Sequence, residues 1–88
     1  MAINLRVGRI IAGAKLLYGE TRWQSPLARL VGLSPALIQQ IADGSRNLTD
    51  GVYRQIATAI IAEAARMRKN ADKVDEIAHK ILRELDGA

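Results

Sequence analysis

The polar side chains that could recognise another molecule gather in one stretch of this sequence, between Arg22 and Arg46. Two adjacent glutamines, Gln39 and Gln40, offer amide donors and acceptors, and arginines stand before and after them. Glutamine amides can form paired hydrogen bonds with a base edge, and guanidinium groups pair with phosphates. The chemistry would be recognition of a polar or anionic partner, and it needs a framework that holds these side chains on one surface.

Catalytic chemistry finds little support in the same sequence. His79 is the only histidine, and its acidic neighbours Asp75 and Glu76 lie among lysines and arginines at the spacing of a solvated helix face. The sequence has no cysteine, no glycine-rich phosphate loop and no Ser/His/Asp order. We therefore expect no enzymatic activity, no metal ion, no cofactor and no small-molecule ligand.

The framework predicted for residues 24–43 is a pair of short helices. The dipeptides Ser25-Pro26 and Ser34-Pro35 each place a hydroxyl before a proline. Such a hydroxyl can cap a helix, and proline is tolerated at the first helical position because its missing N–H would have no partner there. This pattern predicts helices over residues 26–31 and 35–43.

The turn between these helices has its own signals. Gly32 and Gly44 follow the two predicted helices, at positions where a left-handed residue commonly ends a helix. Two helices that cross steeply need a small residue where their axes approach, and Ala28 is placed for that contact. The larger apolar side chains expected to face inward and fix the crossing are Leu27, Val31, Leu33, Ile38 and Ile41.

The spacing of Ala28, Gly32, Ile38 and Ile41 resembles the helix-turn-helix of the lambda-repressor-like, Cro/XRE class of transcriptional regulators. The resemblance covers residues 24–47, about a quarter of the chain, and includes a glycine and an arginine after the second helix. Ala42 departs from the family, where glutamate is common. The resemblance implies that the second helix of the pair enters the DNA major groove and that the protein binds as a dimer.

Outward positions on the predicted second helix and around the turn then take expected roles. Base contacts are expected from Ser34, Ala36, Gln39 and Gln40, because glutamine can bond adenine and an alanine methyl can contact thymine. Contacts to the DNA backbone are expected from Arg22, Gln24, Arg29, Pro35, Asp43 and Arg46. Pro35 and Ala36 replace the polar residues usual in the family, which favours recognition of DNA shape and phosphates.

Helices are also predicted on both sides of the motif. Residues 4–18 carry apolar side chains near helical spacing, and Trp23 is expected to anchor the core or a helix end. Residues 52–86 contain neither proline nor glycine, and their small or apolar residues recur at alternating steps of four and three. One long helix and two helices broken near Asn70 both fit this pattern, and the polar run 66–72 favours two.

The C-terminal pattern predicts a dimerisation segment. Its apolar seam runs from Tyr53 to Leu85, which is longer than a monomer of 88 residues can cover. The residues expected at the dimer interface are Ile60, Met67, Val74, Ile77, Ile81, Leu82 and Leu85.

Together these features predict an all-α protein. We expect a compact domain of four to five helices spanning residues 1–88, with the helix-turn-helix at 24–43 and the C-terminal helical segment at 50–86. The predicted function is that of a double-stranded DNA-binding transcriptional regulator, a repressor that binds an inverted repeat as a homodimer. Small regulators of this architecture are common on phages and mobile elements.

Charge and composition agree with this expectation. Residues 1–50 carry six basic and three acidic side chains, a net charge of +3, whereas residues 51–88 carry seven and six, a net charge of +1. A basic excess favours an anionic partner such as nucleic acid. The absence of cysteine, of a signal-peptide pattern and of any run near the roughly 18 apolar residues of a membrane span predicts a cytoplasmic protein without membrane partners.

Two other classes of function remain open. The C-terminal segment could bind a different helical protein, as in a protein-interaction module or an antitoxin-like protein, with the helix-turn-helix as scaffold. A basic amphipathic helix could instead bind a membrane surface, but the last predicted helix is nearly charge-balanced and lacks Trp and Phe.

Overall fold

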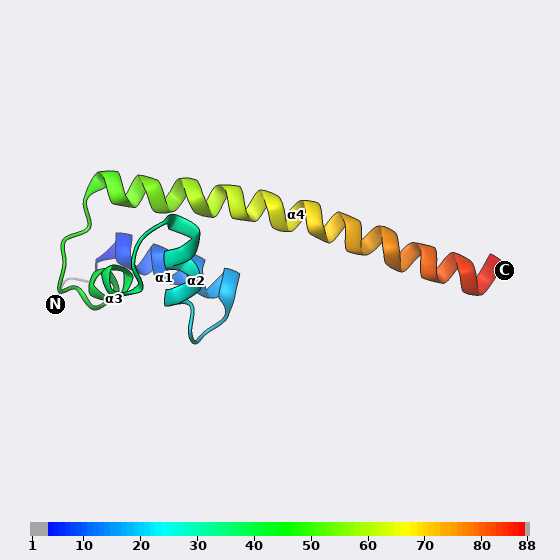
Figure 1. Ribbon diagram of the computed structural model, residues 1–88, viewed down its shortest axis with the longest axis horizontal. Coiled ribbons are helices and arrows are strands. Elements are labelled where there is room, and N and C mark those ends of the chain that lie inside the picture. Colours follow the sequence, from blue (N-terminus) through cyan, green and yellow to red (C-terminus); the bar gives the residue numbers. More distant parts are fainter. Residues whose placement is uncertain (1–3, 88) are drawn as a thin grey trace.

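The computed structural model describes residues 4–87, which form four helices (Figure 1). These are α1 (Leu5–Tyr18), α2 (Gln24–Val31), α3 (Pro35–Asp43) and α4 (Asp50–Gly87). None of the described residues forms a strand. The predicted all-α class, with four to five helices, is confirmed, and the C-terminal segment is a single long helix.

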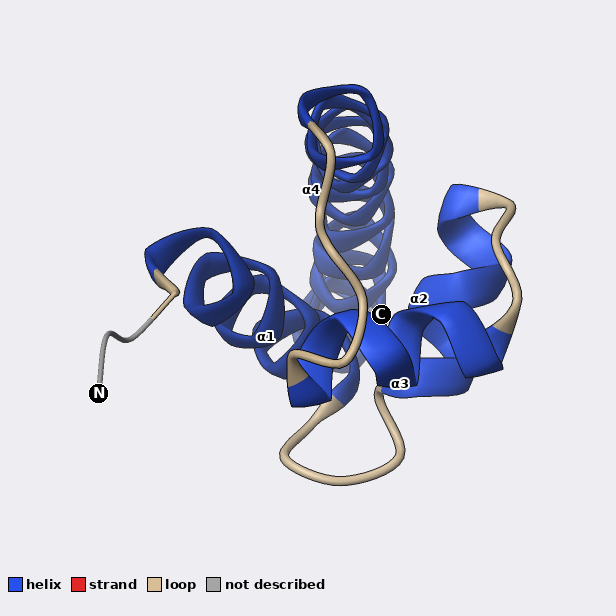
Figure 2. Ribbon diagram, turned by 90° about the vertical axis from the view of Figure 1, so that its left-hand side faces the viewer, coloured by secondary structure: helices blue, strands red, loops and turns tan. Residues whose placement is uncertain are grey.

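The first three helices and the beginning of α4 pack around one core. Figure 2 looks along α4 and shows α1, α2 and α3 grouped below it. α1 and α2 both contact α4, and α3 contacts α1 and α2. The side chains buried in this core are Ile10, Ala14, Trp23, Leu27, Ala28, Val31, Ile38, Ile41 and Ile56. We call this part, residues 4–64, the head.

α1 begins and ends where the sequence predicts. The Asn4 side chain accepts hydrogen bonds from the backbone N–H groups of Arg6 and Val7, at 3.1 and 3.3 Å. At the other end, the N–H of Gly19 donates to the carbonyl oxygen of Lys15 at 2.8 Å. These bonds satisfy backbone groups that a helix end leaves without partners.

The start of α2 differs from the prediction. Ser25 does not cap this helix, because helical geometry already begins at Trp23 and the helix proper begins at Gln24. The Trp23 side chain is buried in the core, as expected of an anchor, and its carbonyl oxygen accepts from the N–H of Leu27 at 3.0 Å. Pro26 still lies in the first turn, where its missing N–H costs no helical hydrogen bond.

Of the two alternatives for the C-terminal segment, one long helix is correct and the favoured break near Asn70 does not occur, because α4 is one continuous helix of 38 residues. The Thr49 hydroxyl accepts from the N–H of Val52 at 3.2 Å near its start. A single asparagine has only a modest helix penalty, and without proline or glycine nearby the polar run does not interrupt the helix. Residues 65–87 are all exposed, and the molecule extends to 62 Å along its longest axis.

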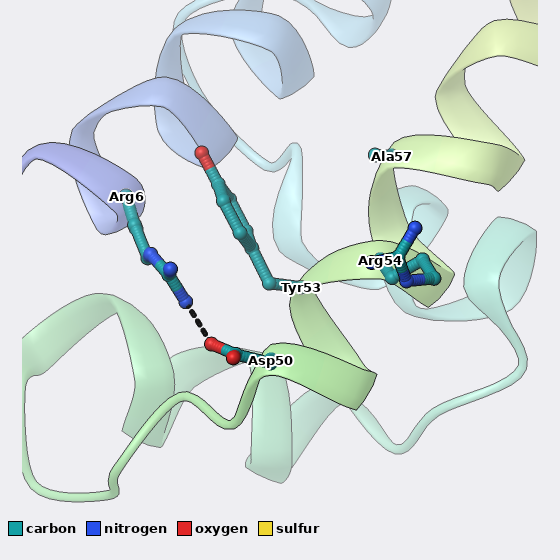
Figure 3. A pocket seen from close by; sticks show the side chains of 5 residues that line it. All are labelled: Arg6, Asp50, Tyr53, Arg54 and Ala57. Atoms are coloured by element: carbon teal, nitrogen blue, oxygen red, sulfur yellow. Dashed lines mark hydrogen bonds and ion pairs between the residues drawn. The ribbon is translucent and has the colours of Figure 1, made fainter.

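An ion pair joins the beginnings of α1 and α4. The Arg6 guanidinium donates to the Asp50 carboxylate and stands 5.0 Å from the centre of the Tyr53 ring, as Figure 3 shows. The hydrogen bond from Arg6 to Asp50 raises the pKa of Arg6 further above its already high value. A shallow pocket lies beside this pair. Because Arg6 and Asp50, which line part of it, are already paired with each other, we interpret the site as a contact that holds α1 against α4.

Candidate nucleic-acid interface

The turn between α2 and α3 has the compact geometry that the sequence predicts. Gly32 adopts a left-handed conformation, with φ of 84°, and both its N–H and that of Leu33 donate to the carbonyl oxygen of Ala28 at 2.9 Å. Ala28 is fully buried. The amide of Gln55 on α4 donates to the Val31 carbonyl oxygen at 3.0 Å, which fixes the end of α2 against α4.

α3 has one buried face and one exposed face. Ile38 and Ile41 are 1% and 3% exposed and hold the helix against the core. The Ser34 hydroxyl accepts from the N–H of Leu37 at 3.1 Å, so the predicted cap of this helix is confirmed. The residues predicted to contact bases are all exposed, and they are Ser34, Ala36, Gln39 and Gln40.

The end of α3 is held by a small network of local hydrogen bonds. Gly44 ends the helix in a left-handed conformation, and the Asp43 carboxylate accepts from the N–H of Ser45 at 2.9 Å. The hydrogen bonds from Ser45 hold the pKa of Asp43 below its usual value. The Arg46 N–H donates to the Gln40 carbonyl oxygen at 3.2 Å, which places Arg46 beside the C-terminal end of α3.

The other residues predicted to contact the DNA backbone lie around α2 and α3. Arg22, Arg29 and Pro35 are exposed, whereas Gln24 is half-buried. Arg22 and Gln24 lie at the start of α2 and Arg29 in its last turn, so the two arginines stand at opposite ends of this helix. Arg22 has φ of 59°, a left-handed conformation that is uncommon outside glycine.

The residues predicted at a dimer interface fall into two environments. Ile60 is half-buried and packs against the core of its own head, close to Gly13 of α1. The other six lie on the part of α4 after residue 64, along most of which Figure 1 shows no neighbouring helix. These exposed residues are Met67, Val74, Ile77, Ile81, Leu82 and Leu85.

Several contacts that position the helices could not be read from the sequence. The partners in the Arg6–Asp50 and Gln55–Val31 interactions are 44 and 24 residues apart, and nothing in local spacing pairs them. Glu63 and Arg66 are three residues apart on α4, a spacing that does signal an ion pair.

The Glu63 carboxylate is largely buried and accepts hydrogen bonds from the Arg66 guanidinium, one of them from Nε at 2.9 Å. These bonds lower the pKa of Glu63 despite its loss of solvent. Burial, and secondarily the Glu63 charge, raise the pKa of Tyr18 on α1.

His79 takes part in contacts within its own helix. Its Nδ1 atom lies 2.8 Å from the Asp75 carbonyl oxygen and 3.5 Å from the carboxylate of the same residue. Within residues 4–87, no three His, Cys, Asp or Glu side chains are grouped so that they could hold a metal ion. Nor does any helix in this part of the chain have the length and apolar character needed to cross a membrane.

Comparison with protein-family models, with curated proteins and with solved structures finds no match to this chain. A functional assignment therefore depends on the arrangement of α2, α3 and α4 and on the side chains that they expose.

Proposed function

We propose that the chain is a sequence-specific double-stranded DNA-binding regulator that inserts α3 into the major groove. In this proposal it acts as a homodimer on an inverted repeat and represses transcription by occupying a promoter. We further propose that the protein belongs to the small regulators that are found on phages and mobile elements.

The observation that carries this proposal is the geometry of α3. It is fixed from behind by Ile38 and Ile41 and crosses α2 at the fully buried Ala28, while its other face is exposed along the whole helix. A short helix held in this way can enter a groove without losing its packing, and Gln39 and Gln40 present amides that can pair with adenine.

The exposed arginines support an interaction with phosphates. The backbone of Arg46 is hydrogen-bonded to the end of α3, which holds its exposed side chain close to the helix that would enter the groove. Arg22 and Arg29 flank α2, which would cross the DNA backbone. Asp43 is engaged by Ser45 and carries a negative charge, so we assign it to shaping the turn beside the DNA.

Selection from a pool of random double-stranded DNA tests the proposal directly. The full chain should enrich a palindromic site, and fluorescence anisotropy should then show tighter binding to that site than to a scrambled duplex. Failure to enrich any motif would remove the claim of sequence-specific regulation.

Substitutions separate reading of bases from binding of phosphates. Gln39→Ala or Gln40→Ala should weaken binding to the selected site by about 1–3 kcal/mol and relax base preference at the position contacted. Arg46→Ala should weaken binding to all duplexes and reduce the salt dependence of the affinity. Arg83→Ala removes the same charge from the exposed end of α4 and should leave the salt dependence unchanged.

A protein-interaction or antitoxin-like role is the second candidate, and the exposed apolar face of α4 favours it. In that role a different helical protein would cover Val74, Ile81 and the residues between them. Affinity for a partner protein that survives Arg46→Ala, together with no DNA selection, would favour this second candidate.

A further inference from the structure

We infer that a second copy of this chain packs antiparallel along the exposed half of α4, centred near Glu76, so that Met67 lies opposite the partner's Leu85. We call residues 50–64 the proximal segment of α4 and residues 65–87 the distal segment. The inference gives the proposed homodimer an orientation and a register, and it depends on the face of α4 rather than on DNA binding.

The distal segment needs a partner to account for its surface. All of its residues are exposed, and its large apolar side chains retain between 42% and 74% of their accessible surface. Most helices in proteins are stabilised by packing of an apolar face, as the proximal segment is by its contact with the head. A monomer leaves this face without such packing.

The exposed face is the continuation of a face that already packs in the head. Tyr53, Ile60, Met67, Val74 and Ile81 form one row at seven-residue spacing along α4. The first two members of the row pack against the core, and the last three are exposed. The side of α4 that binds α1 and α2 in the proximal segment is therefore the side left uncovered in the distal segment.

This continuity decides the orientation of a second copy. A parallel partner that followed the row towards Ile60 would run into α1, because α1 already occupies that side of the proximal segment (Figure 1). An antiparallel partner overlaps only the distal segment and carries its own head away in the opposite direction. Both copies can then cover their exposed faces at once.

The pattern of large and small side chains decides the register. A second row, Ala57, Ala64, Ala71 and Ala78, runs beside the first at the same seven-residue spacing. In the antiparallel register centred near Glu76, Ala71 faces the partner's Ile81 and Ala78 faces the partner's Val74. Every alanine is thus opposite a larger side chain, and facing large and small residues fill a helix interface evenly.

The alternatives pack less well. In a parallel pair in register, Ala71 would face the partner's Ala71 and Ala78 the partner's Ala78. These layers of two small side chains would alternate with layers of two large ones, so the interface would be filled unevenly. Moving the antiparallel register one heptad towards the heads would require Ile60, which already packs against the head, and Ala64, which is already half-buried.

One flank of this interface has an apolar contact and the other has two like charges. Ile77 lies beside the partner's Ile77 and extends the apolar contact, and the same two-fold symmetry brings Asp75 near the partner's Asp75. Asp75 is exposed, so solvent and salt screen the like charges. The apolar layers outnumber this one unfavourable contact.

The arrangement sets the distance between the two heads. With a rise of about 1.5 Å per residue, the Ala57 positions of the two copies lie about 57 Å apart along the helix axis. One turn of DNA spans about 34 Å, so the half-sites of the proposed inverted repeat would lie more than one turn apart. This last consequence rests on the proposed function, whereas the dimer itself does not.

Disulfide trapping tests the inference, because the natural chain has no cysteine. Full-length Met67→Cys and Leu85→Cys would be oxidised separately and as an equal mixture at micromolar concentration. The antiparallel register predicts that the mixture forms the Met67–Leu85 heterodimer at least ten times faster than either variant forms a homodimer. Lys69→Cys, which points away from the interface, mixed with Leu85→Cys sets the rate of random collision.

Each other outcome overturns the inference in a different way. Rapid homodimers of Met67→Cys and of Leu85→Cys alone would show a parallel pair. Rates no greater than the Lys69→Cys mixture in every sample would show that a second copy does not cover this face. The double substitution Gln39→Ala, Gln40→Ala should leave the trapping rates unchanged while it abolishes DNA selection, which separates failure of this inference from failure of the proposed function.

Discussion

The two segments of α4 carry the same apolar repeat in different surroundings. Ile56 in the proximal segment is 1% exposed, whereas Ile77, three heptads further on, is 57% exposed. Helical spacing determines which side chains share a face, and a neighbouring element determines whether that face is buried. The comparison shows that an apolar repeat in the sequence predicts an apolar helix face but does not identify what packs against that face.

The largest expected contrast is between matched alanine substitutions in the two segments. Ile56→Ala should lower the free energy of unfolding of the head by about 2–5 kcal/mol, because it removes a fully buried side chain from the core. Ile77→Ala should change it by less than about 0.5 kcal/mol at low protein concentration, since the side chain is exposed in the monomer. Urea denaturation followed by circular dichroism measures both, and equal effects would contradict the division between the segments.

Removing the distal segment should lower the stability of the head by less than Ile56→Ala does. A chain shortened after Arg66 keeps every buried core residue, so it should unfold cooperatively, with a midpoint that no longer depends on protein concentration. Sedimentation should show a monomer, and affinity for a full inverted repeat should fall towards that for a single half-site. An unfolded product would mean that the proximal segment depends on the distal one.

The smallest expected contrast concerns pH. The pKa of Glu63 is lower in the folded protein because Arg66 donates hydrogen bonds to its carboxylate. Its contribution to stability is therefore present above the ordinary carboxyl pKa of about 4.3 and is lost as pH falls through the lower folded value. Thermal unfolding of Glu63→Gln should be less sensitive to acid in that range, and Glu76→Gln in the distal segment serves as the control.

Signals carried by single residues predicted the local structure well. Gly32, Gly44 and Ser34 mark helix ends because each supplies a backbone conformation or a hydrogen bond that few other residues supply there. Ala28 marks the crossing of two helices for a similar reason, and it is fully buried. The outward direction of Gln39 and Gln40 followed from these, although their contact with DNA stays a prediction.

Features that depend on tertiary packing were beyond local signals. α2 begins at Gln24, two residues earlier than the capping pattern predicted, next to the buried Trp23, and a polar run around Asn70 did not break α4. The Arg6–Asp50 and Gln55–Val31 contacts join residues far apart in the sequence, so no spacing rule could pair them. These contacts fix the relative placement of helices whose existence the sequence does predict.

Because α4 is uninterrupted, its length sets both the distance and the rotation between the head and the exposed apolar face. Each added residue would lengthen the rod by about 1.5 Å and rotate everything beyond it by about 100°. An insertion of seven residues would nearly restore the original rotation, whereas an insertion of two would turn the exposed face away from the side on which the head lies. The continuous helix thus links the head to the exposed face in both distance and direction.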